Sequence, residues 1–124
     1  MDEAIAFRYF SIKNCAYAIV RQLRDEVMRL GFDSSEVRIN QPVEAEYRLE
    51  KDPRNGEYSL IGDWFDDKGI KLGSLLFHPD GSFYVEHDVV KPHPTNKHWF
   101  VEGVNAWGKD MHIRSEAILL PQSE

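Results

Sequence analysis

The hydrophobic pattern of this chain changes its period once, close to the N-terminus. From Ser11 to Gly31, apolar residues recur at steps of three and four, the spacing of one face of an α-helix. We expect Ser11 to cap the start of this helix and Gly31 to end it. Residues 4–10 are apolar or aromatic apart from Arg8, and fit either a short strand or more helix; we favour the strand. The expected helical face consists of Ile12, Cys15, Ala16, Ile19, Leu23, Val27 and Leu30.

Beyond residue 31 the pattern is that of short strands joined by turns. Pro42 is expected to begin a strand in which apolar residues alternate with charged ones as far as Glu50. A short strand at Val37–Ile39 is also possible. Residues 89–97 contain two prolines and should form a loop, and Trp107–Asp110 should form a turn. Further strands are expected at Tyr58–Phe65, Ile70–His78, from Ser82 onward, at Trp99–Asn105 and at Met111–Leu120.

One turn predicts a strand register. If Pro79, Asp80 and Gly81 form a three-residue loop, His78 faces Ser82 and apolar residues meet across the two strands. A two-residue loop would mix the polar and apolar faces, so the pattern favours the longer loop. The pairs that follow are Phe77 with Phe83, Leu75 with Val85, and Gly73 with His87.

These elements predict one α+β domain over residues 1–124. A long N-terminal amphipathic helix should pack on a curved, mainly antiparallel sheet of five or six strands. One helix cannot cover both faces of such a sheet, so either the sheet curls around the helix or a second copy covers one face. The element order resembles that of small uncharacterised bacterial α+β families and, in outline, the cystatin-like arrangement. The resemblance spans most of the chain without a diagnostic motif, and it implies a scaffold rather than an activity.

Composition narrows the functional classes. The formal net charge of −6 argues against a general nucleic-acid binder, which needs a basic surface. Cys15 is the only cysteine, so no intrachain disulfide can form, as is usual in a reducing compartment. We find neither a signal peptide nor an apolar run of about 18 residues that would span a membrane. We therefore expect a cytoplasmic protein that does not bind nucleic acid or membranes.

Candidate chemistry is sparse. The spacing of the five histidines does not indicate a metal site, and no glycine pattern indicates a phosphate site, so we expect neither a metal nor a cofactor. No catalytic residue can be assigned. His87 is expected on the inner face of the sheet beside Gly73, more readily as a hydrogen-bonded core residue than as a ligand or base. Polar groups that could line a pocket between helix and sheet are Asp63, Glu86, His87 and Arg114.

The aromatic residues are a stronger indication of function, because they are more numerous than one helix can readily cover. An aromatic second face usually marks an interface or a ligand groove. We therefore favour a non-catalytic binding or protein-interaction module that self-associates as a homodimer. The alternative is a small enzyme or ligand-binding protein that uses a pocket between helix and sheet. The candidate interface residues are Leu76, Tyr84, Trp99, Phe100 and Trp107.

Overall fold

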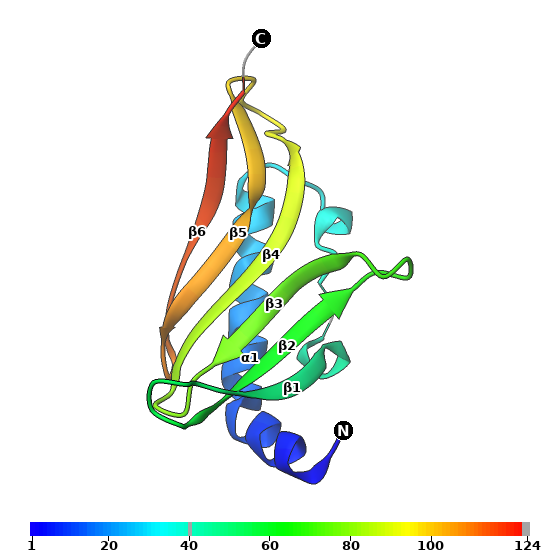
Figure 1. The fold of residues 1–124 in the computed structure, drawn as a ribbon. Helices are drawn as coiled ribbons and strands as arrows, with labels where there is room; N and C mark the ends of the chain where they lie inside the picture. Colours follow the sequence, from blue (N-terminus) through cyan, green and yellow to red (C-terminus); the bar gives the residue numbers. More distant parts are fainter. Residues whose placement is uncertain (40, 123–124) are drawn as a thin grey trace.

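The computed structural model describes residues 1–39 and 41–122 and confirms the α+β architecture. A long helix, α1 (Glu3–Arg29), is followed by two short 3₁₀ helices and then only by strands (Figure 1). The later elements are η1 (Ser34–Glu36), η2 (Pro42–Glu44), β1 (Glu46–Lys51), β2 (Tyr58–Phe65), β3 (Lys71–Phe77), β4 (Ser82–Pro92), β5 (Trp99–Lys109) and β6 (His112–Pro121).

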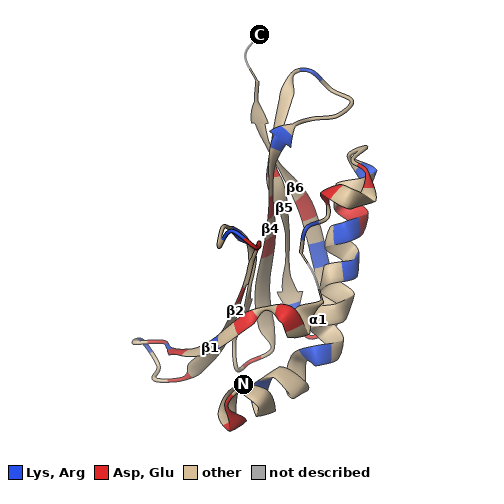
Figure 2. Cartoon of the chain, turned by 90° about the vertical axis from the view of Figure 1, so that its right-hand side faces the viewer, with Lys and Arg blue, Asp and Glu red and all other residues tan. Residues whose placement is uncertain are grey.

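The strands form one open antiparallel sheet in which each strand pairs with its neighbours in sequence, in the order β1-β2-β3-β4-β5-β6. Helix α1 lies against one face, as the nearly edge-on view in Figure 2 shows, and no helix within residues 1–39 and 41–122 covers the other face. The buried core lies between α1 and the covered face, around residues such as Leu23, Leu75 and Val104. Among the described residues, no helix is long and apolar enough to cross a membrane.

The helix begins earlier than the sequence pattern suggested. Asp2 caps it, because its side-chain oxygen accepts a hydrogen bond from the Ile5 N–H at 2.9 Å. The predicted strand at residues 4–10 is therefore wrong, and Ser11 lies inside the helix. Tyr9, which is buried, and Ile5, which is partly buried, continue the apolar face of the helix toward the N-terminus, each about one turn beyond the residue before it. Packing of these two side chains on the core explains why this segment is helical. The predicted end is correct, since Gly31 follows the last turn with φ of +108°.

The register predicted from the turn between β3 and β4 is confirmed. The His78 N–H donates to the Ser82 carbonyl at 2.9 Å, and Gly81 has φ of +92°, a conformation that glycine adopts without strain. The cross-strand pairs are Phe77 with Phe83, Leu75 with Val85, and Gly73 with His87.

Several strand ends differ from the prediction. Residues 37–39 form no strand, and Pro42 begins η2 rather than a strand. Strand β4 continues to Pro92 because a bulge between Asp88 and Lys91 carries it onward, and Pro92 lies at its last position, where a missing N–H is tolerated. Strand β5 continues to Lys109, through most of the predicted turn at residues 107–110, since Gly108 permits a close approach to the backbone of β6; the turn itself is formed at residues 110–111.

Candidate functional site

The sheet face turned away from α1 has no covering element among the described residues (Figures 1 and 2). Side chains on this open face stand in rows that run across the strands, because each strand pairs in register with the next. We call the central one the apolar row, with an arginine at each end. Its members are Arg48, Ile61, Leu76, Tyr84, Trp107 and Arg114.

Two polar rows flank the apolar row, each two residues away along the strands. The acceptor row is rich in carboxylates, and the mixed row carries histidines and a lysine. The acceptor row consists of Glu46, Asp63, Ser74, Glu86, Asn105 and Glu116. The mixed row consists of Glu50, Ser59, His78, Ser82, Lys109 and His112.

Asp63 forms ion pairs with two cationic side chains of the same chain. Its carboxylate accepts a hydrogen bond from Arg48 at 2.6 Å and lies 3.3 Å from the Lys71 ammonium. Both cationic side chains are half exposed, so the pairs contribute little to stability. They do occupy both oxygens of the Asp63 carboxylate with partners from this chain.

Asn105 is a buried and incompletely satisfied polar group of the open face. Its side chain is buried, with 8% of the residue exposed, and its Nδ2 donates to the Tyr84 hydroxyl at 3.2 Å. Tyr84 in turn lies 3.5 Å from a Glu86 oxygen, at the limit for a hydrogen bond. The Asn105 Oδ1 atom has no hydrogen-bond partner among the described residues. An unmet acceptor of this kind costs about 1–3 kcal/mol.

His87 lies on the opposite face, fully buried between sheet and helix layer. Its Nδ1 donates to the Leu72 carbonyl at 3.0 Å, and its Nε2 accepts from the Arg38 backbone N–H at 3.3 Å. Burial lowers the pKa of His87, so the ring is neutral and both nitrogens are satisfied. Asp63, Glu86 and Arg114 are on the open face, and therefore the four residues proposed from the sequence do not line one pocket.

The proposed interface residues divide into two groups. Leu76, Tyr84 and Trp107 are adjacent members of the apolar row. Trp99 and Phe100 lie at the far end of β5, opposite Pro121 and Leu120 of β6.

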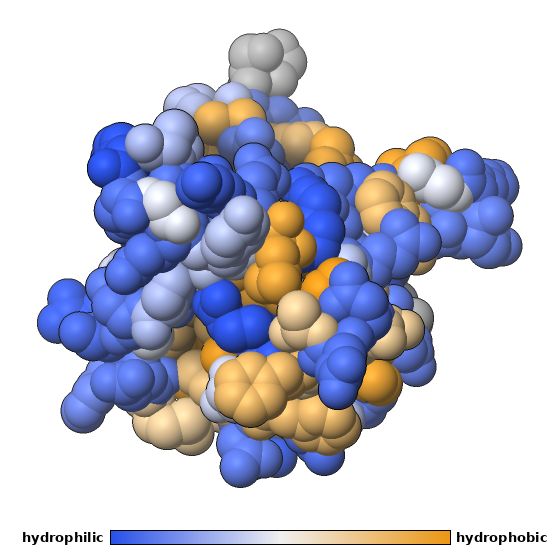
Figure 3. Space-filling model, turned by 60° about the horizontal axis from the view of Figure 1, so that its bottom comes forward, coloured by the Kyte–Doolittle hydropathy of each residue, from blue (hydrophilic) through white to orange (hydrophobic). Residues whose placement is uncertain are grey.

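Sequence reasoning missed three further apolar residues of the surface. Ile61 belongs to the apolar row, beside Leu76. The alternation within residues 58–65 could have predicted this position, because Leu60 and Trp64 are buried on the other face of the sheet. Phe7 and Phe10 lie on the solvent side of α1, with 76% and 69% of each residue exposed. Figure 3 shows apolar side chains gathered at the end of the molecule where α1 begins.

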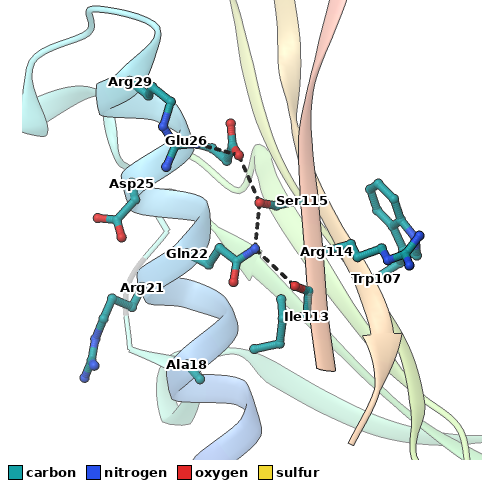
Figure 4. A pocket seen from close by; sticks show the side chains of 10 residues that line it. All are labelled: Ala18, Arg21, Gln22, Asp25, Glu26, Arg29, Trp107, Ile113, Arg114 and Ser115. Carbon is teal, nitrogen blue, oxygen red and sulfur yellow. Dashed lines mark hydrogen bonds and ion pairs between the residues drawn. The ribbon is translucent and has the colours of Figure 1, made fainter. Parts of the chain in front are cut away.

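A cleft of about 800 Å³ runs between α1 and β6 (Figure 4). Its polar groups bind one another: Gln22 donates to the Ser115 hydroxyl at 2.8 Å, and Ser115 donates to Glu26 at 3.0 Å. Arg29 also pairs with Glu26 at 2.7 Å. This network attaches the helix to the edge strand and leaves no convergent reactive group. Figure 4 also shows Arg114 and Trp107 pointing away from the helix.

A smaller cavity of about 400 Å³ lies near Cys15, with Ile12, Phe77 and Met111 among its lining residues. The Cys15 thiol donates to the Asp110 carbonyl at 2.8 Å. Burial and the Asp110 carboxylate raise the pKa of the thiol, so it stays protonated and is a weak nucleophile at neutral pH. No group of three or more metal-binding side chains converges within residues 1–39 and 41–122.

Comparisons of the chain with protein-family models, with curated proteins and with solved structures gave no match.

Proposed function

We propose that this protein is a non-catalytic interaction module that self-associates as a homodimer through its open face. The apolar row carries the proposal. It places Ile61, Leu76, Tyr84 and Trp107 side by side on a sheet face that no other part of the described chain covers. A continuous apolar strip with polar borders is the usual composition of a protein interface.

The size of the open face supports a dimer of modest affinity. Six strands spaced by about 4.8 Å, with six residues along each, give a projected footprint of roughly 29 by 20 Å, about 580 Å² per copy. Side-chain roughness makes the accessible area larger than this projection, so it approaches the ~800 Å² per partner of a standard interface. The edge strand β1 is a poorer surface for association because it is built from charged residues in alternation.

The arrangement of reactive groups favours binding over catalysis. Asp63 is held in two ion pairs, His87 is satisfied on both ring nitrogens, and Cys15 is protonated. A catalytic site would need a nucleophile or base beside an orienting partner and a place for substrate. The single free thiol also fits the reducing, cytoplasmic setting that we include in the proposal.

Sedimentation equilibrium over a wide range of concentrations tests the proposal. The parent protein should be a reversible dimer, and Tyr84→Asp should be monomeric because it places a charge in the apolar row. Tyr58→Asp is the matched control: Tyr58 is also an exposed tyrosine, but it begins β2 away from the open face. It should remain dimeric. A monomeric parent at high concentration, or a Tyr84→Asp variant that still dimerises, would contradict the proposal.

The cavity near Cys15 favours a second candidate, a small-ligand-binding protein. Its lining combines apolar and polar side chains, as that of many ligand pockets does. A fragment library screened by protein-observed NMR should then shift the signals of Ile12 and Met111 in the parent. The same fragments should lose these effects in Cys15→Trp, which fills the cavity. Fragments that shift no signal there would remove this candidate.

A further inference from the structure

The two edges of the sheet differ in how well they are protected. Natural sheets protect their edges with short, charged strands, and β1 has both properties. Strand β6 is ten residues long, contains no lysine, and has its one proline at its last position. The irregularity in its pairing with β5 is a bulge of β5, at residues 101–103. An edge strand without these protections is available for pairing with a further strand.

The turn between β5 and β6 determines which backbone groups of β6 are free. It is a two-residue turn at residues 110–111, so Lys109 and His112 form its closing hydrogen-bonded pair. From there the N–H and C=O groups alternate in direction, and those of Ile113, Ser115 and Ala117 point away from β5. Gln22 donates to the Ile113 carbonyl from that side, at 3.4 Å. Within residues 1–39 and 41–122, no hydrogen bond reaches the outward groups of Ser115 and Ala117.

The cleft between α1 and β6 follows this free edge (Figure 4). On the helix side it is lined by Gln22, Asp25 and Ser115. Its lining also includes Trp107 and Arg114, whose side chains belong to the open face. The cleft therefore passes around the edge of β6, from the helix layer to the open face. An added strand would place its side chains alternately against α1 and beside Arg114.

The open-face side chains of β6 specify the chemistry of such a strand. Arg114, Glu116 and Ile118 follow one another on that face. Neither Arg114 nor Glu116 forms an ion pair within the part of the chain that the structure describes. If the added strand is antiparallel, these three are non-hydrogen-bonded positions, where opposite side chains lie closest. The best complement has a carboxylate opposite Arg114, a cation opposite Glu116 and a β-branched residue opposite Ile118.

Strand β6 of a second copy could meet the same charges, but it would bring a second α1 with it. Helix α1 packs on both β5 and β6, so the two helices would face one another across the new strand pair. The flank of α1 along the cleft carries the exposed side chains of Arg21, Asp25 and Arg29, whereas packed helices meet through apolar stripes. A strand that brings no helix avoids this contact. We infer that the β6 edge binds an extended segment of a partner protein by antiparallel strand addition, independently of the open-face dimer.

Two end-capped peptides of the same composition test this inference by NMR of the isotope-labelled parent protein. The matched peptide, Val-Thr-Lys-Thr-Glu-Val-Thr, sets lysine against Glu116 and glutamate against Arg114. The exchanged peptide, Val-Thr-Glu-Thr-Lys-Val-Thr, sets like charges opposite one another. The matched peptide should shift the amide signals of Ser115 and Ala117 and slow their hydrogen exchange. The exchanged peptide should bind about fivefold more weakly, because two favourable cross-strand pairs become unfavourable.

A backbone modification separates strand addition from charge attraction alone, and it leaves the protein unchanged. N-methylation of the central threonine, whose N–H would meet the Ser115 carbonyl, should weaken binding at least tenfold. N-methylation of the neighbouring lysine is the control and should have little effect, because that N–H points away from β6. In the protein, the double variant Arg114→Glu with Glu116→Arg should prefer the exchanged peptide.

Three results would overturn the inference. The first is an exchanged peptide that binds the parent as tightly as the matched one, and the second is a central N-methyl group without effect. The third is slow exchange of the Ser115 and Ala117 amides that increases with protein concentration without peptide, which would assign the edge to a second copy. Sedimentation of the same samples separates the two proposals. A dimer that binds neither peptide overturns this inference alone, and a monomer that binds the matched peptide overturns the open-face dimer alone.

Discussion

Lowering the pH should destabilise this protein through His87, in a range where carboxylates do not yet titrate. The imidazole is fully buried, and burial lowers its pKa below the ordinary value of 6.5. The folded state therefore resists protonation, whereas the unfolded chain binds a proton as the pH falls through 6.5. Stability is complete above that value and decreases below it.

The magnitude follows from that difference in proton binding. If folded His87 takes up no proton in this range, the free energy of unfolding falls by about 1.4 kcal/mol between pH 7.5 and 5.5. His87→Gln removes the titrating group, so its stability should change much less over the same interval. The variant should also be less stable at pH 7.5 by about 1–3 kcal/mol, because the Leu72 carbonyl or the Arg38 N–H loses its partner.

Urea denaturation at each pH, followed by tryptophan fluorescence, measures these values. Two protein concentrations separate dissociation of a dimer from unfolding of the chain. His98→Gln changes an exposed histidine and is the control for loss of an imidazole. A parent protein equally stable at pH 7.5 and 5.5, or a His87→Gln variant that keeps the full loss on acidification, would refute the reasoning.

Two other predictions concern positions where the structure leaves little freedom. Gly73→Val should lower the free energy of unfolding by about 2 kcal/mol or more, because a Cβ there would meet the Glu86 carbonyl. Ser74→Val, at the next position, is the control and should stay within about 0.5 kcal/mol of the parent in the same urea assay. Equal losses of stability in the two variants would contradict this prediction. In the folded protein at pH 7.5, the Cys15 thiol should react with Ellman's reagent more slowly than free glutathione, because its pKa is raised. In urea it should react at the rate of an ordinary cysteine. A folded protein whose thiol reacts as fast as glutathione would refute the assigned environment.

The element order could be predicted from the sequence because period and turn chemistry agree over most of the chain. The turn at Pro79, Asp80 and Gly81 even determined a register, since only one loop length keeps Phe77 and Phe83 on the same face. The prediction failed where a local signal was ambiguous. Aromatic residues fit a strand and a helix equally well at residues 4–10. Pro92 and Gly108 are usually strand breakers, yet here they lie within strand ends.

The candidate site was less accessible to sequence reasoning. Leu76 and Tyr84 could be placed opposite each other on one face, because they belong to the two strands joined by the turn at residues 79–81, whose sequence predicts the register. Extending the row to Ile61, Trp107 and Arg114 requires the registers of three more strand pairs. Those registers depend on bulges at residues 64–65, 88–91 and 101–103, and no turn motif in the sequence predicts these bulges. The position of His87 on the covered face follows from the same alternation that buries Val85.

Intermolecular nuclear Overhauser effects between an isotope-labelled and an unlabelled copy test the central claim most directly. If the open face joins two copies, the contacts will arise from side chains of the apolar row, among them Tyr84 and Trp107. Contacts confined to Phe7 and Phe10 would instead place the interface on α1 and contradict the account.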